Sequence, residues 1–157
     1  MKHTLSVLVE NRFGVLARVA GLFSARGYNI DSLTVSETED PQISRMTIVV
    51  NAEDERILEQ IKKQLNKLID VITVTDFVKK SYFERELIFV KVATDKKSSA
   101  GLQKLIKRFR AQVLEKKEGH VVIELAEDAE HVRNFVNELK DYKILELVKS
   151  GRVAIAV

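Results

Sequence analysis

An α+β fold with two successive β-α-β-β-α-β units is predicted from two features of the sequence. Short runs of β-branched and aliphatic residues are separated by stretches in which apolar residues recur every three or four positions, which is the period of a helix. This order of strands and helices occurs twice, on either side of a charged stretch at 78–86. A chain of 157 residues has the length of two small domains, each near the lower size at which a hydrophobic core suffices.

The first half holds four predicted strands and two predicted helices. The strands are expected at 4–9, 28–36, 44–51 and 71–77. A polar turn at 10–14 leads into the first helix, which ends at Gly27 because glycine readily adopts the left-handed conformation that follows a helix. The apolar stripes of the two helices are Leu16, Val19, Ala20 and Phe23, and then Ile57, Leu58, Ile61, Leu65 and Leu68. Both helices then pack on one face of an antiparallel sheet, the ferredoxin-like arrangement, and the other face is left uncovered.

The second half repeats this order. Strands are expected at 87–92, 112–117, 121–125 and 144–148, and the second and third of them pair across Glu118 and Gly119. The two helices have the apolar stripes Leu102, Leu105, Ile106 and Phe109, and then Val132, Phe135, Val136 and Leu139. A turn at Ser150 and Gly151 leads to an extra C-terminal strand at 153–157. We therefore expect a first domain at 1–78, a linker at 79–86 and a second ferredoxin-like domain at 87–157.

Composition argues against several classes of protein. The chain has no cysteine, which excludes disulfides and thiolate nucleophiles and fits a reducing compartment, so we expect a cytoplasmic protein. No apolar run approaches the roughly 20 residues that span a membrane, and the start of the chain leads straight into a strand rather than a signal peptide. The net charge of +3 is small for a nucleic-acid-binding protein, and the central strands lack the aromatic residues with which this fold stacks RNA bases. We expect neither a membrane nor a nucleic-acid partner.

The sequence contains no recognisable catalytic or metal site. The histidines, His3, His120 and His131, are not spaced as metal ligands. No serine lies in a G-x-S-x-G turn, and the glycines do not form the G-x-G-x-x-G fingerprint of a dinucleotide site. Four basic residues of the third helix region form either a solvated face or a partner-docking surface, and the sequence leaves both open: Lys104, Lys107, Arg108 and Arg110.

The turn at Asn11–Gly14 is the best candidate for a ligand site. A glycine before a helix lets the chain approach a ligand closely, and the N–H groups of the first helical turn, at 14–16, attract an anion such as a carboxylate. The Asn11 side-chain carbonyl can accept a hydrogen bond from an ammonium group. Together these groups suit an α-amino acid. The alternative is that Asn11 only caps the helix, that Gly14 only turns the chain, and that Asn29 is only an amide at the end of a loop.

Two segments carry a family resemblance. The runs VENRFGVL at 9–16 and FSARGYNIDSL at 23–33 closely resemble the N-terminal ACT domain of the acetohydroxyacid (acetolactate) synthase small subunit. Three later segments also look like that family, so the resemblance covers essentially the whole chain: Arg85-Glu86-Leu87, Phe109-Arg110-Ala111 and Ser150-Gly151-Arg152-Val153-Ala154.

The resemblance implies a regulatory subunit rather than an enzyme. ACT domains of this family bind feedback amino acids, chiefly valine, at a homodimer interface formed by two sheets placed edge to edge. Carried over to this sequence, the contacts from one chain would be Asn11, Gly14, Val15 and Leu16, and those from the other would be Asn29 and Ile30. The implied partner is a large catalytic subunit that uses thiamine diphosphate, Mg²⁺ and FAD to condense pyruvate with pyruvate or 2-oxobutyrate, and no cofactor is expected in this chain. The alternative is a free-standing ACT-domain amino-acid sensor of another enzyme or of a transcription factor.

Overall fold

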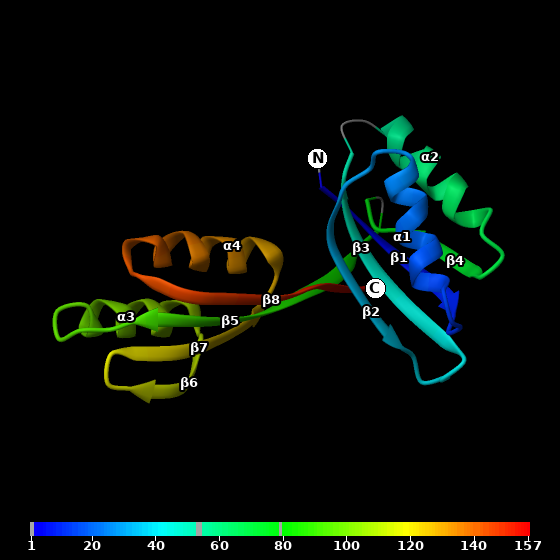
Figure 1. Ribbon diagram of the computed structural model, residues 1–157. Coiled ribbons are helices and arrows are strands. Elements are labelled where there is room, and N and C mark those ends of the chain that lie inside the picture. The colour runs from blue at the N-terminus through cyan, green and yellow to red at the C-terminus, as the bar shows by residue number, and fades with distance from the viewer. Residues whose placement is uncertain (1, 53–54, 79) are drawn as a thin grey trace. The chain divides into compact units, whose positions relative to one another are not determined.

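The computed structural model describes residues 2–52, 55–78 and 80–157, and they form two compact units. The first unit comprises the residues up to Phe83 together with Arg152–Val157, and the second comprises Glu84–Gly151. Each unit has the order β-α-β-β-α-β (Figure 1). The prediction of two ferredoxin-like units is therefore confirmed.

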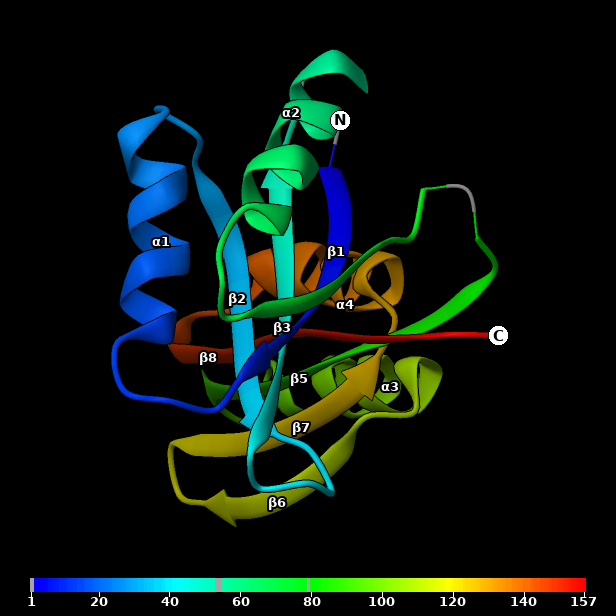
Figure 2. The same cartoon turned by 90° about the vertical axis from the view of Figure 1, so that its right-hand side faces the viewer.

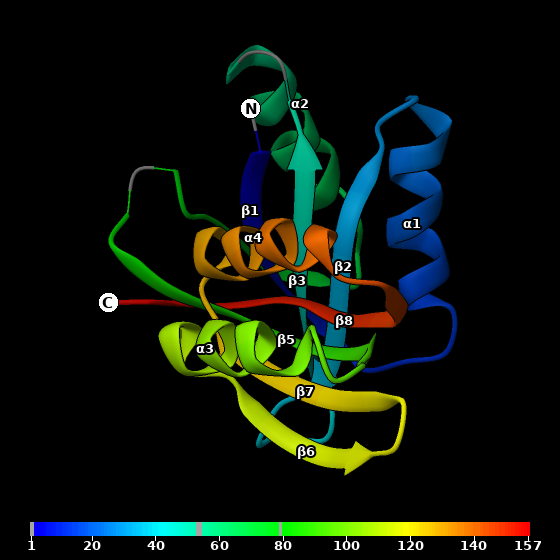
Figure 3. The ribbon, with the colours of Figure 1, turned by 90° about the vertical axis from the view of Figure 1, so that its left-hand side faces the viewer.

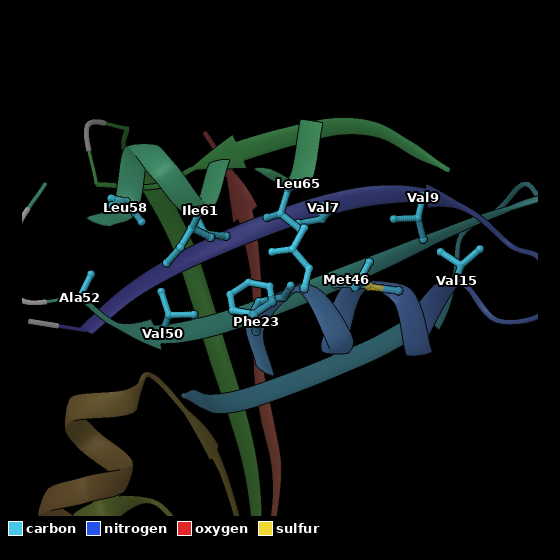
Figure 4. Packing of buried hydrophobic residues seen from close by; sticks show 14 residues of the cluster. Val7, Val9, Val15, Phe23, Met46, Val50, Ala52, Leu58, Ile61 and Leu65 are labelled. Carbon is cyan, nitrogen blue, oxygen red and sulfur yellow. The ribbon is translucent and has the colours of Figure 1, made fainter. Parts of the chain in front are cut away.

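The first unit is a sheet with two helices on one face. Its elements are β1 (Lys2–Glu10), α1 (Val15–Ala25), β2 (Ile30–Glu37), β3 (Ile43–Asn51), α2 (Glu55–Asn66) and β4 (Val71–Asp76). The sheet order within the described residues is β2-β3-β1-β4, with every pairing antiparallel. Figure 2 shows β2, β3 and β1 next to one another in this order. Alternate residues of β1 and β3 face the helices because side chains alternate across a strand. These residues pack against Phe23 of α1 and against Ile61 and Leu65 of α2 (Figure 4).

The second unit repeats this architecture. Its elements are β5 (Tyr82–Ala93), α3 (Ser99–Phe109), β6 (Gln112–Lys117), β7 (His120–Glu127), α4 (Ala129–Glu138), the 3₁₀ turn η1 (Leu139–Asp141) and β8 (Ile144–Ala156). The sheet order is β6-β7-β5-β8. Helices α3 and α4 lie side by side on one face of this sheet (Figure 3), and Phe109 and Phe135 meet between them with ring centroids 5.2 Å apart.

Two boundaries differ from the predicted ones. Strand β5 begins at Tyr82, so residues 82–86 of the predicted linker are strand. The predicted turn at Ser150 and Gly151 and the separate strand after it are wrong, because Ile144–Ala156 is one continuous strand. Gly151 stays inside β8 with a φ of 84°, a left-handed conformation that glycine adopts without steric cost.

The buried face of α1 is also rotated relative to the predicted stripe. The residues that α1 buries are Val15, Val19, Leu22 and Phe23, whereas Leu16 is 45 % exposed. Both sets have helical spacing, so the period alone did not fix which set faces the sheet. The predicted inner faces of the other helices are confirmed, since Leu58, Ile61 and Leu65 of α2 and Leu102, Leu105, Ile106 and Phe109 of α3 are buried.

Candidate functional site

The candidate site begins where β1 ends. The backbone N–H of Asn11 donates to the carbonyl of Gln42 over 2.7 Å, and the N–H of Glu10 donates to the carbonyl of Asp70 over 2.9 Å. The turn between β1 and α1 is thereby anchored on both sides, to the loop before β3 and to the start of β4. A site built on this turn has a fixed backbone.

Asn11 does not cap α1. Its side-chain amide, Nδ2, donates to the backbone carbonyl of Pro41 over 2.8 Å, and no side chain caps the start of the helix. The interpretation of Asn11 as a helix cap is therefore wrong. Because the amide nitrogen holds the loop that contains Pro41, the other end of the side chain, the carbonyl Oδ1, is the group that Asn11 can offer as an acceptor to a ligand.

Gly14 has two reasons to be glycine. Its φ of 82° is left-handed, which costs other L-residues about 1–2 kcal/mol. A Cβ added there would also come within 3.1 Å of Arg18 Nη1. Arg18 is held in that place because its Nε donates to Asp70 Oδ2 over 2.8 Å, and Asp70 is itself buried. Gly14 thus lets α1 begin close beside an ion pair that fixes α1 against the start of β4.

A hollow of ≈ 490 Å³ opens beside Asn11. Its lining includes both charged or amide side chains and apolar ones, a mixture that suits a small ligand with a charged end and an aliphatic end. The lining residues are Glu10, Asn11, Arg12, Asp40, Pro41, Gln42, Ile43 and Ile72.

Among the predicted contacts near the turn, only Asn11 lines this hollow, and Gly14, Val15 and Leu16 do not. The Val15 side chain is buried in the core between helix and sheet, so only its backbone can reach a ligand. Leu16 is exposed on α1. The backbone N–H of Val15 donates to the carbonyl of Arg12 over a long 3.4 Å, and Leu16 presents its side chain on the surface beside the turn.

Asn29 and Ile30 lie at the opposite end of the sheet from Asn11. Ile30 pairs with Val50 of β3, whereas Glu10, next to Asn11, pairs with Ile43. Seven residues of strand, about 23 Å, separate those two positions along β3. Asn29 is engaged locally, with its Nδ2 donating to Asp31 Oδ1 over 3.0 Å. One chain therefore brings Asn11 and Gly14 together but does not bring Asn29 and Ile30 to them.

The structure adds residues that the sequence did not single out. Asp40, Pro41 and Gln42 contribute to the wall because the β2–β3 loop folds back to the end of β1, and Ile72 contributes because β4 pairs beside β1. In the sequence this loop is marked by Pro41, which follows an acidic stretch at 37–40. Its partnership with Asn11 spans thirty positions and depends on strand register.

The histidines and the basic residues of α3 are the other features that the sequence raised. Within residues 2–52, 55–78 and 80–157, no group of three or more His, Asp or Glu side chains could hold a metal ion. No helix in the described part of the chain is long and apolar enough to cross a membrane. On the basic face of α3, Arg108 forms an ion pair with Glu138 and stacks 5.1 Å from the centroid of Phe109, so part of that face serves internal packing.

Known proteins match the whole chain. The family model described as "AHAS small subunit-like ACT domain" matches residues 5–73, and the model described as "Small subunit of acetolactate synthase" matches residues 85–157. A probable acetolactate synthase small subunit of Archaeoglobus fulgidus is 46 % identical, over 98 % of this chain and 96 % of the relative. The acetolactate synthase small subunit of Bacillus subtilis is 39 % identical, over 99 % of this chain and 91 % of the relative. The crystal structure of the small subunit from Thermotoga maritima covers 100 % of this chain and 98 % of its own, with a TM-score of 0.89 and 34 % identity.

Proposed function

This chain belongs to the family of acetolactate synthase small subunits, and on that premise we propose that it activates a separate catalytic subunit and transmits feedback inhibition by valine to it. Its function is regulatory, and the reaction belongs to the large subunit. The thiamine diphosphate, Mg²⁺ and FAD of the condensation reaction belong to that subunit as well. We place the assembly in the cytoplasm.

The observation that carries this proposal is the uncapped start of α1 beside Asn11. The helix begins at a left-handed glycine without a side-chain cap, so the partial positive charge of its first turn is directed at the turn of residues 11–14. A carboxylate is the natural ligand for such a helix start. Asn11 Oδ1 would accept from the ammonium group of the same ligand, and the aliphatic side chain would lie against the apolar wall formed by Pro41, Ile43 and Ile72. Valine has these three parts.

The second half of the site comes from a second copy of the chain in this proposal. Strand β2 is an edge of the first sheet, and an exposed edge readily pairs with another strand. Antiparallel pairing of β2 with β2 of a second copy places the start of one strand opposite the end of the other. Glu37, at the end of β2, pairs with Ser44, at the end of the sheet where Asn11 lies. Asn29 and Ile30 of the second copy would then reach the Asn11 site, and valine would bind only to the dimer.

The two domains have different parts in this proposal. Residues 1–78 bind the effector, 79–86 link the domains, and 87–157 form the second domain. Valine favours the arrangement of the dimer to which it binds more tightly, and a coupling free energy of about 1–3 kcal/mol changes activity by 5- to 150-fold.

Titration calorimetry of the intact chain with valine tests the site. Asn11→Ala removes a hydrogen bond to a charged group, worth about 1.5–3 kcal/mol, so we expect valine affinity to fall by about 10- to 150-fold. Gly14→Asp places a carboxylate where the ligand carboxylate would bind and strains the left-handed turn, so binding should be lost. Asn66→Ala, on the exposed end of α2, is the matched control and should bind valine as the wild type does. Equal affinity in all four proteins contradicts the site.

Mixing the chain with an acetolactate synthase catalytic subunit tests the function. We expect acetolactate production to rise on addition of the chain and to fall again when valine is added. A chain that binds valine but leaves the catalytic subunit unaffected would instead be a free-standing amino-acid sensor.

A further inference from the structure

The segment Arg152–Val157, which we call the strap, belongs to the first unit although the whole second unit precedes it in sequence. The backbone N–H of Arg152 donates to Ser32 Oγ over 3.2 Å, and its guanidinium Nη1 donates to Thr4 Oγ1 over 3.3 Å. At the other end of the strap, the N–H of Val157 donates to the carbonyl of Ser81 over 3.0 Å. The strap therefore lies on the sheet face opposite α1 and α2, the face expected to be uncovered.

That sheet face is rich in hydroxyl groups. Thr4 and Ser6 alternate with the core residues of β1, and their cross-strand partners on β3 and β2 include Thr47, Ser32 and Thr34. Thr4, Ser6 and Thr47 are only 3 %, 2 % and 3 % exposed, although they point away from the helices. Hydrogen bonds of Arg152 and Val157 hold the strap on this face, beside the buried Val49, and outside the cluster that packs against α1 and α2. A contact of this kind opens at lower free energy than a packed core does.

The strap is continuous with the second unit. It is the last part of β8, and the earlier part of the same strand, from Ile144, is the edge strand of the second sheet. Gly151, with its left-handed φ of 84°, lies immediately before Arg152. The strap is thus a covalent extension of the second sheet that is bound to the first.

Arg152 also lies close to the proposed effector contacts. Ser32, which accepts from its backbone N–H, is two residues from Ile30 on β2, and β2 is the edge at which we place the second copy. Thr4, which accepts from its guanidinium, is on the central strand β1, which leads to Asn11. A ligand that rearranges β2 relative to β1 therefore changes the distance between the two hydroxyls that Arg152 bridges.

We propose that Arg152 is a positioning residue that couples effector binding on the first sheet to the second unit through β8. This inference rests on the proposed function, because it assigns the route by which valine occupancy reaches the rest of the chain. Arg152 touches neither the ligand nor the catalytic centre. Its loss should separate valine binding from valine inhibition.

The test compares valine binding with valine inhibition in the full chain reconstituted with the catalytic subunit. The variants are Arg152→Ala, Arg152→Lys, which keeps a cationic donor, and Thr4→Val, which removes the acceptor. Lys149→Ala is the matched control, because it removes a positive charge from the same strand on the other side of Gly151, where Lys149 Nζ lies 3.9 Å from Glu86. Circular dichroism melting verifies that each variant is folded.

We expect Arg152→Ala to bind valine within about twofold of wild type while its maximal inhibition falls from about 5-fold or more to below about 2-fold. Thr4→Val should weaken inhibition in the same direction, Arg152→Lys should restore most of it, and Lys149→Ala should be inhibited like wild type. In amide exchange experiments, saturating valine should change the protection of the Arg152 N–H in wild type.

Three results would overturn the inference. Full inhibition of both Arg152→Ala and Thr4→Val excludes the coupling role and leaves the proposed function intact. Loss of valine binding in both folded variants would show that the strap is needed for the valine site to form, and not for coupling. A wild-type chain that binds no valine removes the proposed function, and this inference with it.

Discussion

The starts of the first helices in the two units, α1 and α3, hold the same topological position and are built differently. Before α3, Asp95 Oδ1 accepts from the backbone N–H groups of Lys97 and Ser98 over 2.8 and 2.7 Å, so the protein's own carboxylate occupies the turn that leads into the helix. Before α1, Gly14 turns the chain and no side chain caps the helix. In the second unit a side chain of the protein accepts hydrogen bonds from backbone N–H groups before the helix, whereas in the first unit we propose that a ligand carboxylate occupies this place.

This difference supports the proposal that the two units, which share one fold, have different roles. Sheet order, helix placement and core are equivalent in the two units, so the architecture does not distinguish a binding unit from a scaffold unit. The turn before the first helix distinguishes the two units. A helix start attracts a carboxylate, which is either a side chain of the protein or a ligand from solution. A few residues of loop would thus account for the proposed amino-acid site at α1 and for the lack of a corresponding proposal at α3.

The largest expected effect tests the equivalence of the two cores. Phe23 and Phe135 are 1 % and 0 % exposed, and truncating a buried phenylalanine costs about 3–5 kcal/mol. We expect Phe23→Ala to lower amide protection mainly in β1 and β3, and Phe135→Ala mainly in β5 and β7. Native-state hydrogen exchange of the two variants measures this. Equal loss of protection in both sheets from either variant would contradict the description of two separate cores.

The ends of the same two helices allow a second comparison. After α1 the left-handed residue is Gly27, with a φ of 69°, whereas after α3 it is Arg110, with a φ of 57°. Because a non-glycine residue is strained in this conformation, Arg110→Gly should stabilise the protein by about 1 kcal/mol, and Gly27→Ala should destabilise it by a similar amount. Thermal denaturation checks both. A lower Tm for Arg110→Gly would show that its side chain contributes more than its backbone strain costs.

The smallest expected effect concerns pH and the helix start of the second unit. Hydrogen bonds from Ser98 and then from the Lys97 N–H hold the pKa of Asp95 below its usual value. A carboxyl group whose pKa is lower in the folded than in the unfolded state stabilises the fold above its unfolded pKa, and this contribution is lost as the pH falls through the folded pKa. Asp95→Asn should therefore have a lower Tm than wild type at neutral pH, with the difference shrinking in acid. Parallel melting curves across this range measure it, and a difference independent of pH would contradict the assignment.

Most of the fold was predictable because local patterns agreed with the tertiary structure. The change from a period of two to a period of 3.6 marked each strand and helix. The start of β5 was missed because Glu84, Arg85 and Glu86 are three consecutive charged residues, so this part of the strand resembles a linker. The continuity of β8 was missed because Gly151, which usually marks a turn, is accommodated inside the strand.

Only those residues of the candidate site that lie next to one another in the sequence could be predicted. Asn11 and Gly14 stand out in sequence because they lie between a strand and a helical stripe. Their supports come from distant segments, since Asn11 binds the carbonyl of Pro41 and the neighbour of Gly14, Arg18, binds Asp70. The outward orientation of Leu16 depends on how α1 packs on the sheet. Contacts over thirty or more positions depend on strand register, which a single sequence does not fix.

The division of β8 between the units has a consequence for biosynthesis. The strap is part of the first unit, yet it is translated after every residue of the second. As the chain emerges from the ribosome, the first unit can form its core but not cover the hydroxyl-bearing face of its sheet. Regulation by the effector, if it passes through the strap, therefore begins only after the second unit has been synthesised. A truncated chain that still dimerises would bind the effector without transmitting the signal to the second unit.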